Sequence, residues 1–123
     1  MVEIRQATQK DVDAFYGKKP MYSMRAYVAV LDDEVIAIGG VCRQEGHLVA
    51  FSEMKPEMRK HKKDIIRVGQ KIFEIIQGYN TVFTVANPKE KHAKKHITRL
   101  GFELVEINRE GEEVYRWHKP PHR

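Results

Sequence analysis

Between residues 25 and 51 the apolar residues recur with a period of two, and polar segments at residues 32–34 and 45–46 interrupt the pattern. Both segments are short enough to be tight turns. An alternating pattern broken by tight turns is typical of antiparallel strands joined as a meander. The sequence therefore predicts three successive strands, at residues 27–31, 35–41 and 47–51. Gly39 and Gly40 lie inside the second strand and indicate either a bulge or the close approach of another backbone.

The remainder of the chain alternates between helical and strand patterns. Helices are predicted where apolar residues have helical spacing, at residues 9–16, 64–77 and 93–100. Strands are predicted at residues 2–7, 81–86, 102–107 and 113–117. Residues 17–24 are predicted to be a loop. The near-continuous apolar run 81–86 predicts a central strand with both faces covered. The predicted fold class is α+β, with a mixed, mostly antiparallel sheet of six to seven strands flanked by helices.

The chain of 123 residues is long enough for one domain, predicted at residues 1–118, followed by a flexible tail at 119–123. No apolar run approaches the roughly 20 residues that cross a bilayer, and no membrane partner is predicted. The single cysteine, Cys42, cannot form an internal disulfide or a cysteine-based metal cluster. These features predict a cytoplasmic protein without a bound metal.

The formal charge of +5 is unevenly distributed along the chain. Residues 55–71 carry +5 and residues 87–101 carry +4, so the rest of the chain carries −4. Two basic segments on a mildly acidic body indicate a local anion site or a nucleic-acid-binding face. The alternative is that these lysines belong to solvated helix faces.

The order of elements, the run from Glu53 to Arg59 before a helix, and Ala93 eight residues before Gly101 resemble the GNAT superfamily of acyl-CoA-dependent N-acetyltransferases. The resemblance extends over nearly the whole chain. Four segments, at residues 36–40, 51–53, 59–64 and 98–102, are similar to small GNAT-like proteins encoded by phages and prophages.

The resemblance implies a cofactor, acetyl-CoA, and an amine acceptor that is a small molecule or a protein. It implies direct attack of the amine on the thioester, with backbone N–H groups of a bulged strand around Phe51 to Met54 holding the developing negative charge. Glu53 is the candidate general base, since burial could raise its pKa. Ser52, Tyr16 and Tyr22 are candidates for the acceptor side. The implied cofactor-binding residues are Phe51, Ser52, Met54, Arg59, Lys60, Lys62, Lys63 and Asn87.

Two positions depart from the family pattern. The family has Arg or Gln, two variable residues, Gly, one variable residue, then Gly or Ala; Arg59 matches, but Lys62 and Asp64 replace the small residues. Either the basic side chains bind the phosphates instead, or the helix begins earlier, near Glu57, and closes the phosphate site. The family's proton-donating tyrosine corresponds to Ile97, which leaves its neighbour His96 as the candidate acid.

Three functions are consistent with these features. The first is an acetyl-CoA-dependent N-acetyltransferase, the second a catalytically inactive GNAT-fold binding or virion-associated protein, and the third a nucleic-acid-binding module. The basic segments lack interleaved aromatic residues, which argues against base stacking. The exposed edge of the last hairpin makes a homodimer a further expectation.

Overall fold

The computed structural model describes residues 1–17, 23–89 and 91–121. It contains seven strands, three α-helices and one short 3-10 helix in these residues. The strands are β1 (Glu3–Gln6), β2 (Met24–Leu31), β3 (Glu34–Gln44), β4 (His47–Met54), β5 (Thr81–Ala86), β6 (Glu103–Ile107) and β7 (Glu113–His118). The helices are α1 (Gln9–Tyr16), η1 (Pro56–Lys60), α2 (Lys62–Gln77) and α3 (Lys91–Arg99). The predicted order and the mixed α+β class are confirmed.

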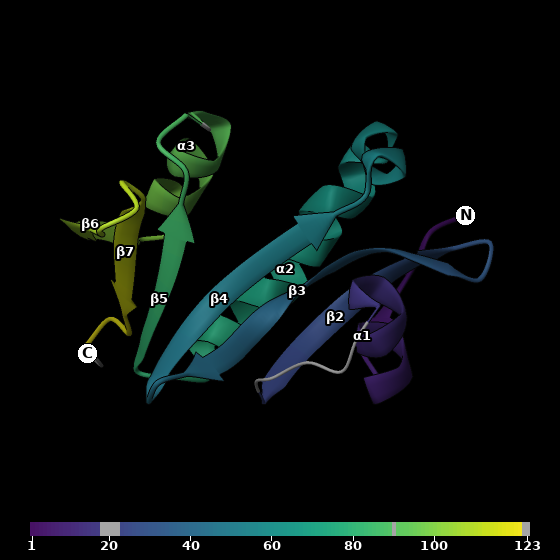
Figure 1. Ribbon diagram of the computed structural model, residues 1–123, viewed down its shortest axis with the longest axis horizontal. Coiled ribbons are helices and arrows are strands. Elements are labelled where there is room, and N and C mark those ends of the chain that lie inside the picture. Colours follow the sequence, from purple (N-terminus) through teal and green to yellow (C-terminus); the bar gives the residue numbers. More distant parts are fainter. Residues whose placement is uncertain (18–22, 90, 122–123) are drawn as a thin grey trace.

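The seven strands form one sheet in the order β1-β2-β3-β4-β5-β7-β6. All neighbouring strands are antiparallel except β4 and β5, which are parallel. Figure 1 shows α1 in front of β2 and β3, while α2 crosses behind the sheet. A parallel pair needs a crossover connection, and η1 with α2 provides it between β4 and β5.

Apolar side chains of opposite sheet faces pack against different helices. Val12 of α1 packs with Val28 and Ile38 on one face. On the other face, α2 contributes Val68 to a cluster with Ala29 and Ala37. Alternation along each strand explains this division, because successive side chains point to opposite faces. None of the described helices is long and apolar enough to cross a membrane.

The first helix begins where the sequence predicted. The Thr8 side chain accepts a hydrogen bond from the Asp11 backbone N–H, and the Asp11 carboxylate accepts one from the Thr8 backbone N–H. Arg5 of β1 donates to the same carboxylate at 2.9 Å, so the cap also ties α1 to the sheet. The guanidinium hydrogen bond lowers the pKa of Asp11 to about 2 against the opposing effect of burial.

The two glycines of β3 reflect close approach and not a bulge, because β3 and β4 keep a regular register from Ala37–Met54 to Gln44–His47. A Cβ on Gly40 would lie 2.0 Å from the Arg25 carbonyl oxygen, and one on Gly39 would lie 2.3 Å from Ile72 Cδ1. Only residues without a side chain fit such distances.

The prediction that β5 is covered on both faces is wrong for one face. Val82 and Ala86 are buried against the helices α2 and α3, whereas Val85 is 43% exposed on the opposite face. An apolar run shows that a strand is central but does not show how many layers cover it. The predicted loop at residues 17–24 lies largely outside the described residues, and β2 begins at Met24.

Candidate functional site

The parallel strands β4 and β5 pair over a very short length. Only two residue pairs join them, Val49 with Phe83 and Ala50 with Thr84. The Thr84 hydroxyl donates to the Ala50 carbonyl at 3.0 Å and closes this contact. Beyond it, residues 51–54 remain paired with β3 but not with β5. The two strands diverge there, as Figure 1 shows, and one edge of β4 is left open in the middle of the sheet.

Backbone direction decides which groups of β4 face this opening. The Lys55 N–H donates to Ile36 of β3 at 2.8 Å, whereas the Ala50 carbonyl points to β5. Backbone groups of successive strand residues point to alternate sides. The N–H groups of Ser52 and Met54 therefore point into the opening, while those of Phe51 and Glu53 point to β3. The predicted bulge at residues 51–54 is wrong, because divergence of β5 exposes these groups without one.

A helix N-terminus follows the open end of β4. The short helix η1 ends at Lys60, and α2 begins at Lys62. His61 between them has non-helical backbone angles, φ −100° and ψ 60°. The first N–H groups of a helix have no intrahelical acceptor, and no side chain caps α2. The alternative of one continuous helix from near Glu57 is wrong. Met58 is buried in the core, and this anchors η1 separately.

The side chains around this N-terminus are mostly cationic. Arg59, Lys60, Lys62 and Lys63 are exposed, and none forms an ion pair with a described carboxylate. The Asp64 carboxylate is instead bound by Arg67 at 2.9 Å. His61 Nε2 is the one buried side-chain nitrogen or oxygen of the described residues without a hydrogen-bond partner. Free N–H groups, unpaired cations and the helix dipole together favour binding of an anion here.

The last turn of α1 lies over the open end of β4, on the sheet face opposite α2. The Lys55 ammonium lies 5.7 Å from the centre of the Phe15 ring. Tyr16 packs in the same apolar cluster as Phe51. Burial raises the pKa of Tyr16, and the neighbouring Glu53 carboxylate raises it further. Tyr16 and Glu53 are therefore neighbours across the sheet face.

Several predicted site residues occupy less central positions. Glu53 is exposed, so the burial on which its predicted role as a base depended is not found. His96 is exposed on α3, and its Nε2 lies 3.8 Å from the place that a Cβ on Gly69 of α2 would take. Ile97 packs into the core and carries no proton to donate. The Asn87 side chain accepts from the Lys89 N–H at 3.0 Å and stabilises the turn after β5.

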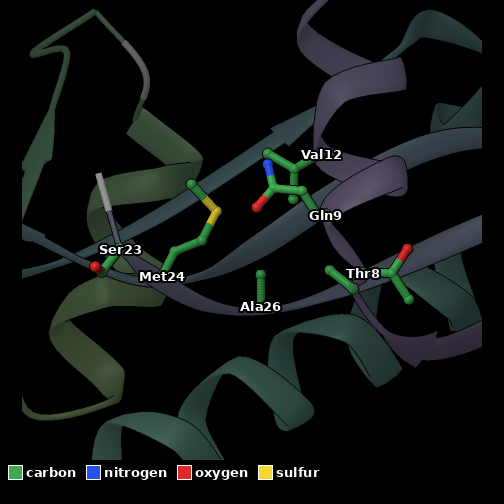
Figure 2. A pocket seen from close by; sticks show the side chains of 7 residues that line it. Thr8, Gln9, Val12, Ser23, Met24 and Ala26 are labelled. Atoms are coloured by element: carbon green, nitrogen blue, oxygen red, sulfur yellow. The ribbon is translucent and has the colours of Figure 1, made fainter. Parts of the chain in front are cut away.

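A separate hollow of about 290 Å³ lies at the start of α1. Figure 2 shows it between the first turn of α1 and the start of β2, bordered by Thr8, Gln9 and Met24. These residues lie at the end of α1 away from Tyr16, and the hollow includes neither the open edge of β4 nor the N-terminus of α2. It is not part of the candidate site.

Solved structures of acetyltransferases superpose on this chain over nearly its whole length. The chain has the GNAT fold. The ribosomal-protein-S18-alanine N-acetyltransferase of Escherichia coli superposes with a TM-score of 0.69 over 99% of this chain and 96% of that chain, at 12% identity. An N-acetyltransferase of Staphylococcus aureus gives 0.69 over 98% and 99%, at 10% identity.

A third structure of the GNAT fold, from Bacillus anthracis, was solved in complex with acetyl coenzyme A. It superposes with a TM-score of 0.59 over 96% of this chain and 99% of that chain, at 13% identity. No protein-family model and no curated protein matches the sequence. The similarity therefore lies in the three-dimensional arrangement and not in the sequence.

Proposed function

We propose that the chain is an acetyl-CoA-dependent N-acetyltransferase that transfers an acetyl group to an amine. The observation that carries the proposal is the combination of an open β4 edge with an uncapped, cation-rich helix N-terminus directly after it. The first offers hydrogen-bond donors to an extended chain, and the second offers an anion site. Acetyl-CoA is a ligand with both parts, an extended amide-containing arm and a diphosphate.

The residues present fit this cofactor. The first N–H groups of α2 and the side chains of Arg59, Lys60, Lys62 and Lys63 would bind the phosphates. The N–H groups of Ser52 and Met54 would donate to the arm and to the thioester carbonyl. Bound acetyl-CoA supplies an activated acyl group. Lys62 stands where the family has a small residue and would add a cationic contact to the phosphates, whereas the Asp64 carboxylate at the second such position opposes phosphate binding.

The acceptor amine would approach from the sheet face that carries Glu53 and Tyr16. An amine attacks only when neutral, and Glu53 is the carboxylate at the open edge that can accept its proton, directly or through one water. Positioning of the two reactants can contribute on the order of 7 to 11 kcal/mol. A strong acid for the leaving thiol is therefore not required, which agrees with an isoleucine at position 97.

The acceptor is proposed to be a small-molecule or protein amine; the E. coli neighbour, by its name, acts on a protein alanine. A phage or prophage origin, a cytoplasmic location and a homodimer stay predictions. For a homodimer the exposed strand β6, with Ile107 64% exposed at its end, is the edge that would pair.

Ligand-dependent thermal unfolding tests the proposal. A ligand at 100 times its dissociation constant stabilises by about 2.7 kcal/mol, which for this chain length is roughly 10 °C. We expect this shift with acetyl-CoA, a smaller one with ATP and none with heparin. A shift with heparin alone would contradict the proposal and favour the nucleic-acid-binding module.

Arg59→Ala tests the location of the phosphate site. We expect it to weaken acetyl-CoA binding about 10-fold, because one charge-assisted contact is worth about 1.5 kcal/mol. Lys10→Ala removes an exposed cation from α1 and is the matched control, expected to bind as the parent does. Equal binding by both variants would place the phosphates elsewhere.

A second candidate function is a GNAT-fold protein that binds acyl-CoA without transferring the acyl group. The observation that favours it is Ile97, which packs in the core where the family has its proton donor. Free coenzyme A release distinguishes the two functions, measured with an alanine-ended peptide, a lysine peptide and spermidine as acceptors. Acetyl-CoA binding without release by any acceptor would support the binding protein.

A further inference from the structure

We propose that Tyr16 is a positioning residue that holds the carboxylate of Glu53 in place to receive a proton from the acceptor amine. The inference rests on the proposed function, since it assigns a role within that reaction. Tyr16 comes from the end of α1 and Glu53 from β4, so the fold brings together residues that are 37 positions apart.

Independent contacts place the last turn of α1 over the end of β4. Phe15 lies beneath the Lys55 ammonium, and its ring meets the Tyr16 ring edge to face at 5.1 Å. Tyr16 and Phe51 pack against the same buried cluster, and Phe51 and Glu53 point to the same face of β4 because they are two residues apart. The phenol of Tyr16 is thus anchored by aromatic and apolar contacts beside the carboxylate.

The first turn of α1, at the end away from Tyr16, is fixed to β1. Asp11 receives hydrogen bonds from Arg5 and from the Thr8 backbone, which attaches α1 to the edge of the sheet. Gly17 then ends the helix with φ 73°, directly after Tyr16. The phenol is therefore held at the end of a short helix that is capped at both ends, and not on a loop.

The chemistry of the pair assigns different roles to the two side chains. In the proposed arrangement the phenol O–H donates to one carboxylate oxygen of Glu53 and leaves the other oxygen for the acceptor. The acceptor ammonium loses one N–H proton to that second oxygen, and the nitrogen keeps the electron pair with which it attacks. The raised pKa of Tyr16 keeps its proton on the phenol, so that Tyr16 donates throughout and does not act as a base.

Kinetics of three variants test the role in catalysis. The acceptor is the one of the alanine-ended peptide, the lysine peptide and spermidine that gives the highest rate with the parent. Tyr16→Phe is expected to lower kcat about 10-fold, because one hydrogen bond to a charged group is lost. The KM for acetyl-CoA should stay unchanged. Glu53→Gln is expected to lower kcat further. In the double variant, Tyr16→Phe should cost nothing more, because the group it positions is gone.

Tyr27→Phe is the matched control. It removes a phenol hydroxyl from the opposite face of the sheet, where the Tyr27 ring contacts Lys71, and is expected to leave kcat unchanged. An active parent with equal kcat in Tyr16→Phe would overturn the inference while leaving the proposed function intact. Additive losses in the double variant would overturn it as well.

Titration of the tyrosines by NMR tests the contact without activity. In protein labelled at the tyrosine ring carbon, the Tyr16 signal is identified by its loss in Tyr16→Phe. We expect Tyr16 to titrate at lower pH in Glu53→Gln than in the parent, because the neighbouring negative charge is gone. Identical titration in both would overturn the inference. A parent that shows the coupling but transfers no acetyl group would refute the proposed function, and the catalytic role of Tyr16 with it.

Discussion

Replacing Asp11 by asparagine is expected to lower the free energy of unfolding in a strongly pH-dependent way. The Asp11 side chain is only 9% exposed and accepts two guanidinium hydrogen bonds from Arg5. These bonds lower its pKa from 3.8 to about 2. A shift of that size corresponds to about 2 kcal/mol of stability, and little of it is screened by solvent at this exposure.

The direction of the pKa shift of Asp11 determines how this stability depends on pH. A carboxylate whose pKa is lower in the folded state contributes its full stabilisation above its unfolded pKa of about 4. The contribution falls to about 1 kcal/mol at pH 3 and to less than half of that at pH 2, as the folded protein takes up the proton. The parent should lose this part of its stability between pH 4 and pH 2, whereas Asp11→Asn has no such part to lose.

Urea unfolding at pH 7, 4, 3 and 2 measures the difference. With a denaturant dependence near 2 kcal/mol per molar, the parent and Asp11→Asn should differ by about 1 M in midpoint at pH 7 and converge at pH 2. Asp13→Asn, on the same helix and bound to the Gln9 side chain, is the matched control. A midpoint difference that stays constant from pH 7 to pH 2 would refute the ion-pair reasoning.

Three further predictions concern the turns, the glycines and the anion site. Asp33→Gly should raise the melting temperature by about 2 to 4 °C, because Asp33 has φ 63° and glycine adopts this conformation without strain; an unchanged melting temperature would contradict this. Gly40→Ala should destabilise by more than about 2 kcal/mol, since its Cβ would meet a backbone oxygen, whereas Gly69→Ala in α2 should be neutral or stabilising in the same urea assay. Asp64→Asn should bind acetyl-CoA about 2- to 5-fold more tightly by calorimetry, because a negative charge leaves the N-terminus of α2; weaker binding would show that the carboxylate supports the site.

The strands and helices were predictable because each has a strong local signal. Period-two alternation located β2, β3 and β4, and the helical spacing of apolar residues located α1 at residues 9–16. The start of α2 was harder to predict from the sequence, since His61 belongs to neither helix and is not a residue that typically caps one. The exposure of one face of β5 depends on whether a helix covers that face. The residues of β5 alone do not show where the helices lie.

The candidate site was predictable in the segments that supply backbone and charge. Only residues 55–58 separate residues 51–54 from residues 59–63, so the proximity of the two segments follows from chain order. The contact of Tyr16 with Glu53 joins segments that are distant in the chain and depends on the packing of α1 across β3. Sequence reasoning identified both residues as candidates but could not pair them.

The shortness of the β4–β5 ladder also has a mechanical consequence for the whole molecule. With two residue pairs between them, strands β1 to β4 and strands β5 to β7 are joined by few backbone hydrogen bonds and depend on the shared apolar cluster that contains Val41, Val82 and Tyr115. Ile72 of α2 packs against this cluster and also against the cluster that contains Ala29 and Ala37, so the helix bridges the two sides of the opening. The width of the opening between β4 and β5 therefore depends on side-chain packing beneath α2 more than on the hydrogen bonds of the sheet itself.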